Sequence, residues 1–99
     1  LLDHARSYRA LVQRIALHVP RGACIAAPGV PRGQLVALEY LGRYRVNALA
    51  SLADSDCDFA LRMESRQNPR PAPSGWSLVA RERRPTDRQE ITAIYRRAR

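Results

Sequence analysis

The sequence predicts an α/β fold: a mixed sheet of about five strands, packed against two helices and ending in an antiparallel β-hairpin. Two segments repeat apolar residues at the helical spacing of three and four, and a short, wholly apolar segment between them is typical of a buried strand. The C-terminal third alternates apolar and polar residues, as half-buried strands do. The 99 residues are 45% hydrophobic and 26% charged, so we expect one domain over residues 1–99.

The first helix is expected over residues 4–19. Asp3 can cap it by accepting a hydrogen bond from a first-turn N–H, while Pro20 and Gly22 end it. After that turn, residues 23–27 are apolar throughout and predict the first and central strand, buried on both faces. The apolar positions of the helix are Ala5, Tyr8, Leu11, Val12, Ile15, Ala16 and Val19.

A second helix is expected from Pro31, which suits a first helical position, to about Gly42. Residues 45–49 then predict a short parallel strand, which completes a β-α-β unit over residues 23–49. The apolar stripe of this helix comprises Leu35, Val36, Leu38, Tyr40 and Leu41.

Residues 58–63 alternate and predict a strand beside the first one, with Phe59, Leu61 and Met63 on one face. Residues 65–75 contain three prolines, which interrupt both helices and sheet ladders, so we expect a loop. The last two strands form a hairpin around a turn at residues 84–89. Their apolar alternations are Trp76, Leu78 and Ala80, and Ile91, Ala93 and Tyr95.

The net charge is +8, from 17 basic and 9 acidic residues, and all the basic residues are arginines. Guanidinium groups favour phosphates and anionic headgroups. Nucleic-acid binding would also need exposed aromatic residues, but Trp76 and Tyr95 fall on the apolar alternation and are expected in the core. A cytosolic nucleic-acid-binding module is therefore the alternative function. The candidate contacts to an anionic surface are Arg81, Arg83, Arg84, Arg88, Arg96 and Arg97.

No residue has a recognisable catalytic or metal-binding context. His4 and His18 are fourteen residues apart and lack a second ligand at a spacing of three or four. The alternating Asp54, Asp56 and Asp58 resemble the start of a calcium loop, which would also need a glycine at its sixth position and a glutamate at its twelfth. We therefore expect no catalytic residue, no cofactor and no metal in this chain.

The connection at residues 28–33 follows the first strand and precedes the second helix. Anions commonly bind at this place in open α/β sheets, because the first N–H groups of the helix are unpaired. A plain connection without a ligand is the other interpretation.

Cys24 opens the first expected strand and Cys57 directly precedes the third. If these strands are parallel neighbours, the two sulfur atoms lie at the same end of the sheet and can form a disulfide. Two free thiols are expected in the cytosol and a bridge in an oxidising compartment. The sequence pattern alone leaves both states open.

The segment from Trp76 to Arg97 contains a Trp, then Arg-Pro-x-Asp-Arg-x-Glu, then Tyr-Arg-Arg. It resembles the C-terminal end of bacterial membrane glycosyltransferases of the protein mannosyltransferase and aminoarabinose transferase type, with Thr86 where that family usually has glycine. The opening segment, residues 3–9, and the Cys24 and Asp56-Cys57 positions are also similar to that family's tail domain.

The resemblance implies an inner-membrane enzyme that transfers a sugar from a polyprenyl-phosphate carrier to an acceptor outside the cytoplasm. Its catalytic acidic residue lies in a loop between membrane spans, outside these 99 residues. This chain would be a noncatalytic periplasmic domain, monomeric in isolation, whose partners are the transmembrane portion of the same polypeptide and anionic lipid or polyprenyl-phosphate headgroups. A periplasmic location would permit the Cys24–Cys57 bridge. Because Met63 is the only methionine, we expect the chain to be part of a longer protein.

Overall fold

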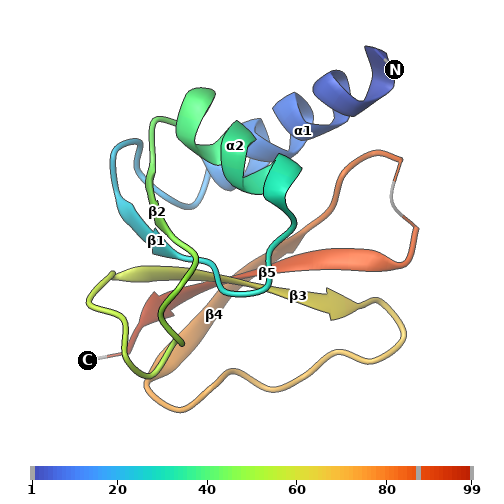
Figure 1. Cartoon of the computed structure of the whole chain (residues 1–99). Helices are drawn as coiled ribbons and strands as arrows, with labels where there is room; N and C mark the ends of the chain where they lie inside the picture. The colour runs from blue at the N-terminus through green and yellow to red at the C-terminus, as the bar shows by residue number, and fades with distance from the viewer. Residues whose placement is uncertain (1, 87, 99) are drawn as a thin grey trace.

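Figure 1 shows the computed structural model, which describes residues 2–86 and 88–98. In this part of the chain, two helices and five strands form an α/β fold, which confirms the predicted class. In chain order the elements are α1 (Leu2–Ile15), β1 (Cys24–Ala26), α2 (Arg32–Tyr40), β2 (Arg45–Asn47), β3 (Phe59–Ser65), β4 (Trp76–Glu82) and β5 (Glu90–Arg97).

The strands form one mixed sheet in the order β2-β1-β3-β5-β4. β1 runs parallel to β2 on one side and to β3 on the other, so the β-α-β unit and the position of β3 beside β1 are confirmed. β5 lies between β3 and β4 and is antiparallel to both. The prediction that the first strand is central was wrong, because the returning strand of the hairpin pairs with β3 and leaves β3 in the middle.

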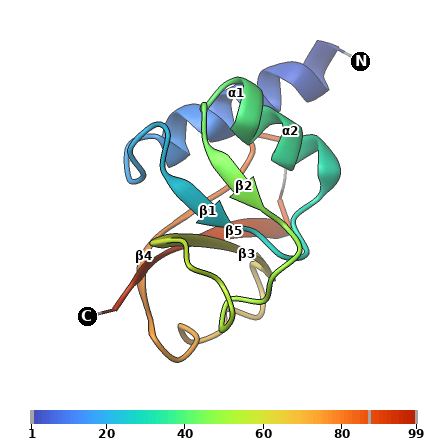
Figure 2. The same cartoon turned by 60° about the vertical axis from the view of Figure 1, so that its left-hand side comes forward.

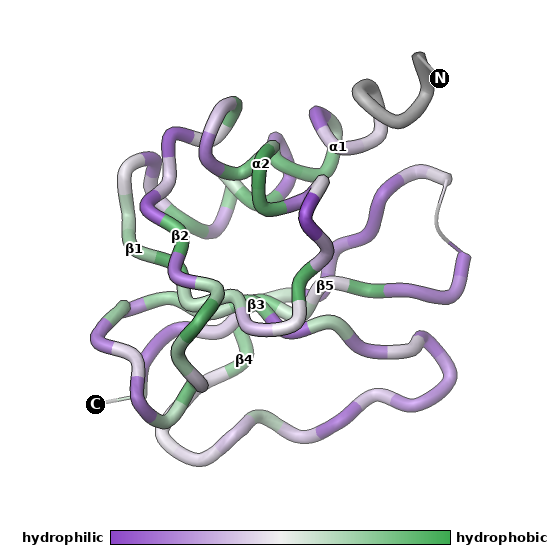
Figure 3. The backbone as a smooth tube through the Cα atoms, in the orientation of Figure 1, coloured by the Kyte–Doolittle hydropathy of each residue, from purple (hydrophilic) through white to green (hydrophobic). Residues whose placement is uncertain are grey.

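Both helices cover one face of the sheet (Figure 1, Figure 2). The main core fills the space between these layers, and Figure 3 shows hydrophobic segments there and hydrophilic ones in the outer connections. A smaller core lies on the opposite face, around Trp76 and Tyr95, where Leu52 and Cys57 of the β2–β3 connection pack against it. The most deeply buried side chains of the main core are Leu11, Ile15, Ile25, Leu38, Leu61 and Ile94.

The helix bounds differ from those predicted. α1 ends at Ile15, and residues 16–18 form turns, although Val19 still reaches the core and its N–H bonds to the Ile15 carbonyl at 2.9 Å. α1 begins at Leu2, so Asp3 lies within the helix rather than at its cap. The described residues contain no helix that is long and apolar enough to cross a membrane.

α2 buries part of the predicted stripe: Leu38 is fully buried, and Leu35 and Leu41 pack against the main core. Tyr40 is 79% exposed and Val36 is also exposed, whereas the buried positions include Gln34 and Leu38. Gln34 is accommodated because its Nε2 donates a hydrogen bond to Thr92 Oγ1 of β5 at 3.0 Å, which satisfies both buried polar groups. Pro31 precedes the helix instead of starting it.

Gly42 allows the chain to turn sharply between α2 and β2. A Cβ atom at this position would collide with the Tyr44 ring and lie 2.8 Å from the Leu38 carbonyl oxygen. Tyr44 is itself fixed, since its hydroxyl donates to the Val19 carbonyl at 2.7 Å. Only glycine fits between these neighbours.

The predicted hairpin of β4 and β5 is confirmed, but β4 contains a β-bulge between Leu78 and Ala80. Because of the extra residue, Val79, the later side chains of β4 point to the opposite faces of the sheet from those that strict alternation would give. Leu78 lies opposite Tyr95 on the face away from the helices, whereas Ala80 lies opposite Ile94 and packs on the main core. The strict alternation predicted for this strand was therefore wrong beyond Leu78.

Candidate functional site

The bulge in β4 places Glu82 on the helix side of the sheet, where it meets α1. Its carboxylate accepts a hydrogen bond from Arg14 Nε at 2.5 Å and lies 2.8 Å from His18 Nε2. Glu82 is only 9% exposed. Burial by itself would raise the pKa of this carboxyl group, but the hydrogen bonds and positive charges of Arg14 and His18 outweigh burial and leave the pKa below its ordinary value. Glu82 is therefore charged at neutral pH and links α1 to the sheet.

The contribution of this ion pair to the stability of the fold should depend on pH. Because the pKa of Glu82 is lowered in the folded state, its contribution to stability is complete above the ordinary carboxyl pKa and is lost as the pH falls through the lower folded value. Glu82→Gln is expected to lower the free energy of unfolding by about 1 kcal/mol at neutral pH. The difference from wild type should shrink towards zero below about pH 4.

Urea unfolding at a series of pH values measures this effect. Glu39→Gln removes an exposed carboxylate from α2 and serves as the matched control, with an expected change within about 0.5 kcal/mol at every pH. A Glu82→Gln deficit that persists unchanged in acid would contradict an ionic origin.

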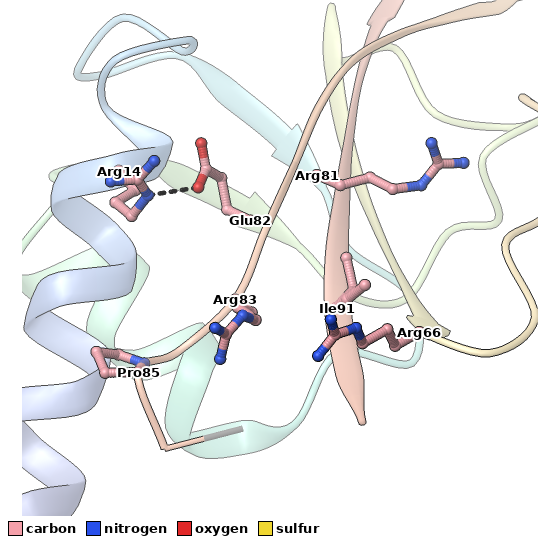
Figure 4. Close-up of a pocket in the computed structure, with 7 residues that line it drawn as sticks. All are labelled: Arg14, Arg66, Arg81, Glu82, Arg83, Pro85 and Ile91. Carbon is pink, nitrogen blue, oxygen red and sulfur yellow. Dashed lines mark hydrogen bonds and ion pairs between the residues drawn. The ribbon is translucent and has the colours of Figure 1, made fainter. Parts of the chain in front are cut away.

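A groove of about 460 Å³ lies beside this ion pair, between α1 and the ends of β3 and β4 (Figure 4). Figure 4 shows Arg14 and Glu82 joined on one side, Arg83 and Arg66 extending towards one end, and Arg81 turned away from Glu82. Four arginines and a single carboxylate thus line one groove. The complete lining is Arg14, Arg66, Arg81, Glu82, Arg83, Pro85 and Ile91.

A second ionic cluster lies on the opposite face, under the proline-rich loop of residues 66–75. Glu64 has a side chain only 1% exposed and accepts a hydrogen bond from Arg81 Nε, while Arg62 Nη2 lies 3.9 Å from its other oxygen. The same two arginines hold the loop: Arg62 donates to the Pro71 carbonyl at 2.8 Å and Arg81 to the Arg70 carbonyl at 3.2 Å. These arginines therefore connect a buried carboxylate to the loop backbone.

Arg81→Ala should destabilise the fold because it removes the hydrogen-bonded cation from buried Glu64. We expect the free energy of unfolding to fall by about 2 kcal/mol, within the range for an unsatisfied buried polar group. The double variant Arg81→Ala/Glu64→Gln should recover part of that loss, since no unpaired charge remains. Chemical denaturation measures the free energy of unfolding of each variant. A double variant whose loss in this free energy exceeds the summed losses of the two single variants would contradict this explanation.

No family model matches the chain, no curated protein is significantly similar to it, and no solved structure matches it. The geometry of the described residues is therefore the basis for assigning a site.

The six arginines predicted to face an anionic surface do not form one patch. Arg84 lies over the Tyr8 ring, with its guanidinium carbon 4.4 Å from the ring centroid. Arg97 lies over Trp76 at 4.5 Å and also donates to the Cys57 carbonyl at 2.6 Å. Arg81 pairs with Glu64, as described above, and Arg83, Arg88 and Arg96 are exposed.

Sequence reasoning missed Arg14 and Arg66 as groove residues. Arg14 belongs to the polar face of α1, and Arg66 directly follows β3 in the proline-rich connection, so neither stands out along the chain. Their proximity depends on the sheet order and on the bulge that turns Glu82 towards α1. No local pattern in the sequence signals either feature.

Cys24 and Cys57 form a disulfide with their Cα atoms 4.9 Å apart. Cys24 opens β1, and Cys57 lies two residues before β3, its parallel neighbour, so the two cysteines meet at the same end of the sheet. Both cysteines of the chain are used in this bridge.

The other candidates are not brought together. His18 contacts Glu82, and the side chain of His4 lies outside the described residues. Among the residues that are described, no group of three His, Cys, Asp or Glu side chains could hold a metal ion. The connection at residues 28–33 leads into α2 beside the Tyr8 ring, whose nearest atom would be 3.0 Å from a Cβ at Gly33. A side chain thus borders the start of this helix.

Proposed function

We propose that this chain is a noncatalytic, periplasmic accessory domain of an inner-membrane glycosyltransferase that uses polyprenyl-phosphate-linked sugars. The disulfide between Cys24 and Cys57 is the observation that carries this proposal. Disulfides persist in oxidising compartments such as the periplasm and are rare in the cytosol. The resemblance of residues 76–97 to the end of such enzymes supplies the enzyme class.

The ionic interactions support a structural or binding role rather than a catalytic one. Glu64 and Glu82 are largely withdrawn from solvent, and each is engaged by an arginine. These pairs hold the proline-rich loop and α1 against the sheet. The partners that we propose are the transmembrane portion of the same polypeptide and anionic lipid or polyprenyl-phosphate headgroups, which the net charge of +8 would attract.

The alternative, a cytosolic nucleic-acid-binding module, has less support. Proteins that bind single strands stack bases on exposed aromatic side chains. Here Trp76 is 5% exposed and Tyr95 is fully buried. Strongly salt-dependent binding to RNA or DNA that weakens in Arg83→Ala/Arg84→Ala would nevertheless favour this alternative.

The proposal is tested on the full-length protein in its native cells. A membrane-impermeant maleimide should label Cys24, the less buried of the two cysteines, in intact cells only after reduction, because the domain is outside the cytoplasm and its thiols are bridged. Labelling that requires cell lysis but no reductant would overturn the proposal.

The same cells test the enzyme class. Deleting residues 1–99 from the full-length protein should reduce sugar transfer from a polyprenyl-phosphate donor, while expression of the membrane portion is checked by immunoblot. A full-length sequence with no hydrophobic spans of about 20 residues would overturn the membrane-enzyme assignment.

A further inference from the structure

We propose that the turn after α1 and the turn after α2 together form a surface that docks on an anionic lipid bilayer. Leu17 and Tyr40 enter the headgroup region, while Arg21, Arg43 and Arg45 bind lipid phosphates. These five residues are called the two-turn surface. The inference rests on the proposed function, because an accessory domain of an inner-membrane enzyme is held beside such a bilayer.

The two turns lie side by side in the folded chain. The Tyr44 hydroxyl donates a hydrogen bond to the Val19 carbonyl at 2.7 Å, and Arg21 Nη1 donates to the Leu41 carbonyl at 2.6 Å. Arg45 directly follows Tyr44 as the first residue of β2. The turn after α1 and the start of β2 lie on the same side of the molecule in both views (Figure 1, Figure 2). The arginines of both turns therefore belong to one end of the protein.

This end carries positive charge that the fold does not neutralise. Residues 16–22 and 41–45 contain three arginines, all exposed, and no acidic residue. In the part of the chain that the structure describes, Arg43 and Arg45 form neither an ion pair nor a side-chain hydrogen bond. The partner of Arg21 is an uncharged carbonyl group. Arginines in this state are attracted to the negative surface of a bilayer that contains anionic lipids.

Two large apolar side chains are exposed beside these charges. Leu17 is 73% exposed in the turn after α1, and Tyr40 is 79% exposed as the last residue of α2. Tyrosine favours the interface between lipid and water, and exposed apolar residues next to basic ones are typical of segments that lie on membranes. Glu39 lines the same pocket as Tyr40 and Arg43, but it forms no ion pair among the described residues.

The backbone at Arg43 indicates that its side chain has a role outside the fold. Its φ is 61°, and among the residues that the structure describes only glycines share a positive φ. Glycine usually takes such a left-handed position after a helix, because a Cβ atom is unfavourable there. Arginine therefore costs backbone energy at this position, and its exposed, unpaired side chain returns none to the fold. Residues held in this way are concentrated at functional sites.

The test is co-sedimentation of the 99-residue chain with vesicles of phosphatidylcholine and phosphatidylglycerol in equal amounts. Wild type should bind these vesicles at least about tenfold more tightly than vesicles of phosphatidylcholine alone. Arg43→Gly/Arg45→Gln should weaken binding to the anionic vesicles by at least about tenfold, because it removes two of the three cations. No binding by wild type would overturn the proposal.

The single variant Arg43→Gly separates lipid binding from folding. It should bind the anionic vesicles several-fold more weakly than wild type, yet its thermal midpoint should be no lower, because glycine suits the left-handed backbone. A lower thermal midpoint with unchanged vesicle binding would show that the Arg43 side chain serves the fold and would overturn its role.

Arg66→Gln/Arg88→Gln is the matched control, since it removes two exposed arginines and gives the same net charge as the double variant. Arg66 directly follows β3 and Arg88 precedes β5, at the end of these strands that lies on the right in Figure 1, far from the two turns. This control should lose less than about twofold in vesicle binding at physiological salt. An equal loss in both double variants would show that binding follows net charge alone and would overturn the docking surface.

Leu17→Ser/Tyr40→Ser tests the apolar part of the two-turn surface. It should weaken vesicle binding by at least about fivefold, because two side chains that enter the headgroup region are lost. Leu49→Ser is its control, since Leu49 is 98% exposed in the β2–β3 connection, and it should bind like wild type. Unchanged vesicle binding in Leu17→Ser/Tyr40→Ser would overturn the insertion of these two side chains.

Titration with single-stranded DNA tests the other polyanion that an exposed tyrosine beside arginines could bind. DNA binding that is tighter than vesicle binding and is lost in Arg43→Gly/Arg45→Gln would overturn the lipid assignment. The vesicle experiments use the purified chain, whereas the proposed function is tested by labelling in cells. Periplasmic labelling without vesicle binding would therefore overturn the docking surface alone, and vesicle binding without periplasmic labelling would overturn the proposed function alone.

Discussion

The double variant Cys24→Ala/Cys57→Ala is expected to lose about 3–4 kcal/mol of stability relative to the oxidised wild type. The bridge joins residues 33 positions apart, so breaking it restores a large amount of conformational freedom to the unfolded chain. For a chain of this length, we expect the thermal midpoint to fall by on the order of 15–25 °C. Calorimetry and guanidinium denaturation of the purified chain measure both quantities.

Reduced wild type is the control for this prediction, because it lacks the bridge but keeps both sulfur atoms. It should match the double variant within about 1 kcal/mol. If the reduced wild type instead remained as stable as the oxidised form, the bridge would contribute nothing, and the argument for an oxidising compartment would lose its energetic basis.

Trp76→Ala is the second large effect, with an expected loss of about 3–5 kcal/mol. Trp76 begins β4 and packs with Cys57 and Tyr95 in the smaller core, while Arg97 covers its ring. Removing the indole would leave a cavity on the face of the sheet that has no helix, where only connecting loops could close it. The fall in the denaturant concentration at the unfolding midpoint measures this loss of stability, provided that the free energy of unfolding depends on denaturant concentration equally steeply in both proteins.

Leu78→Ala is the matched control on the same strand and the same face. Leu78 is 40% exposed, so its truncation should cost less than about 1 kcal/mol. A Trp76→Ala protein as stable as wild type would identify Trp76 as a surface residue available to a ligand, contrary to its burial here.

Local pattern predicted most of the elements and three of the four strand pairings, but not the pairing of β5 with β3. The apolar run at residues 23–27 and the alternation at Phe59, Leu61 and Met63 each have a short-range cause, and both became strands near the expected positions. The insertion of β5 beside β3 depends on long-range pairing, which no local period encodes. For the same reason, the early end of α1 was missed, since Val19 keeps the helical period although the backbone has already turned.

The candidate site was predictable only in its chemistry. The excess of arginine indicated an anionic partner, but the sequence could not show which arginines would form hydrogen bonds and ion pairs within the protein itself. Arg81 and Arg97 extend along the sheet and reach acceptors on loops or neighbouring strands, because the long apolar stem of arginine places its charged end far from its own backbone. Arg14 and Arg66 could not be predicted as groove residues from the sequence, because the bulge at Val79 and the sheet order together create the groove.

The two outer strands of the sheet have a consequence for aggregation. An unpaired strand edge is a template on which another chain can add a strand. β2 is only three residues long, and Asn47 at its end folds its side chain back onto the N–H groups of Leu49 and Ala50. β4, at the other margin, is interrupted by its bulge. Neither margin offers a long, straight backbone ladder, so neither edge is a good template for the addition of another strand.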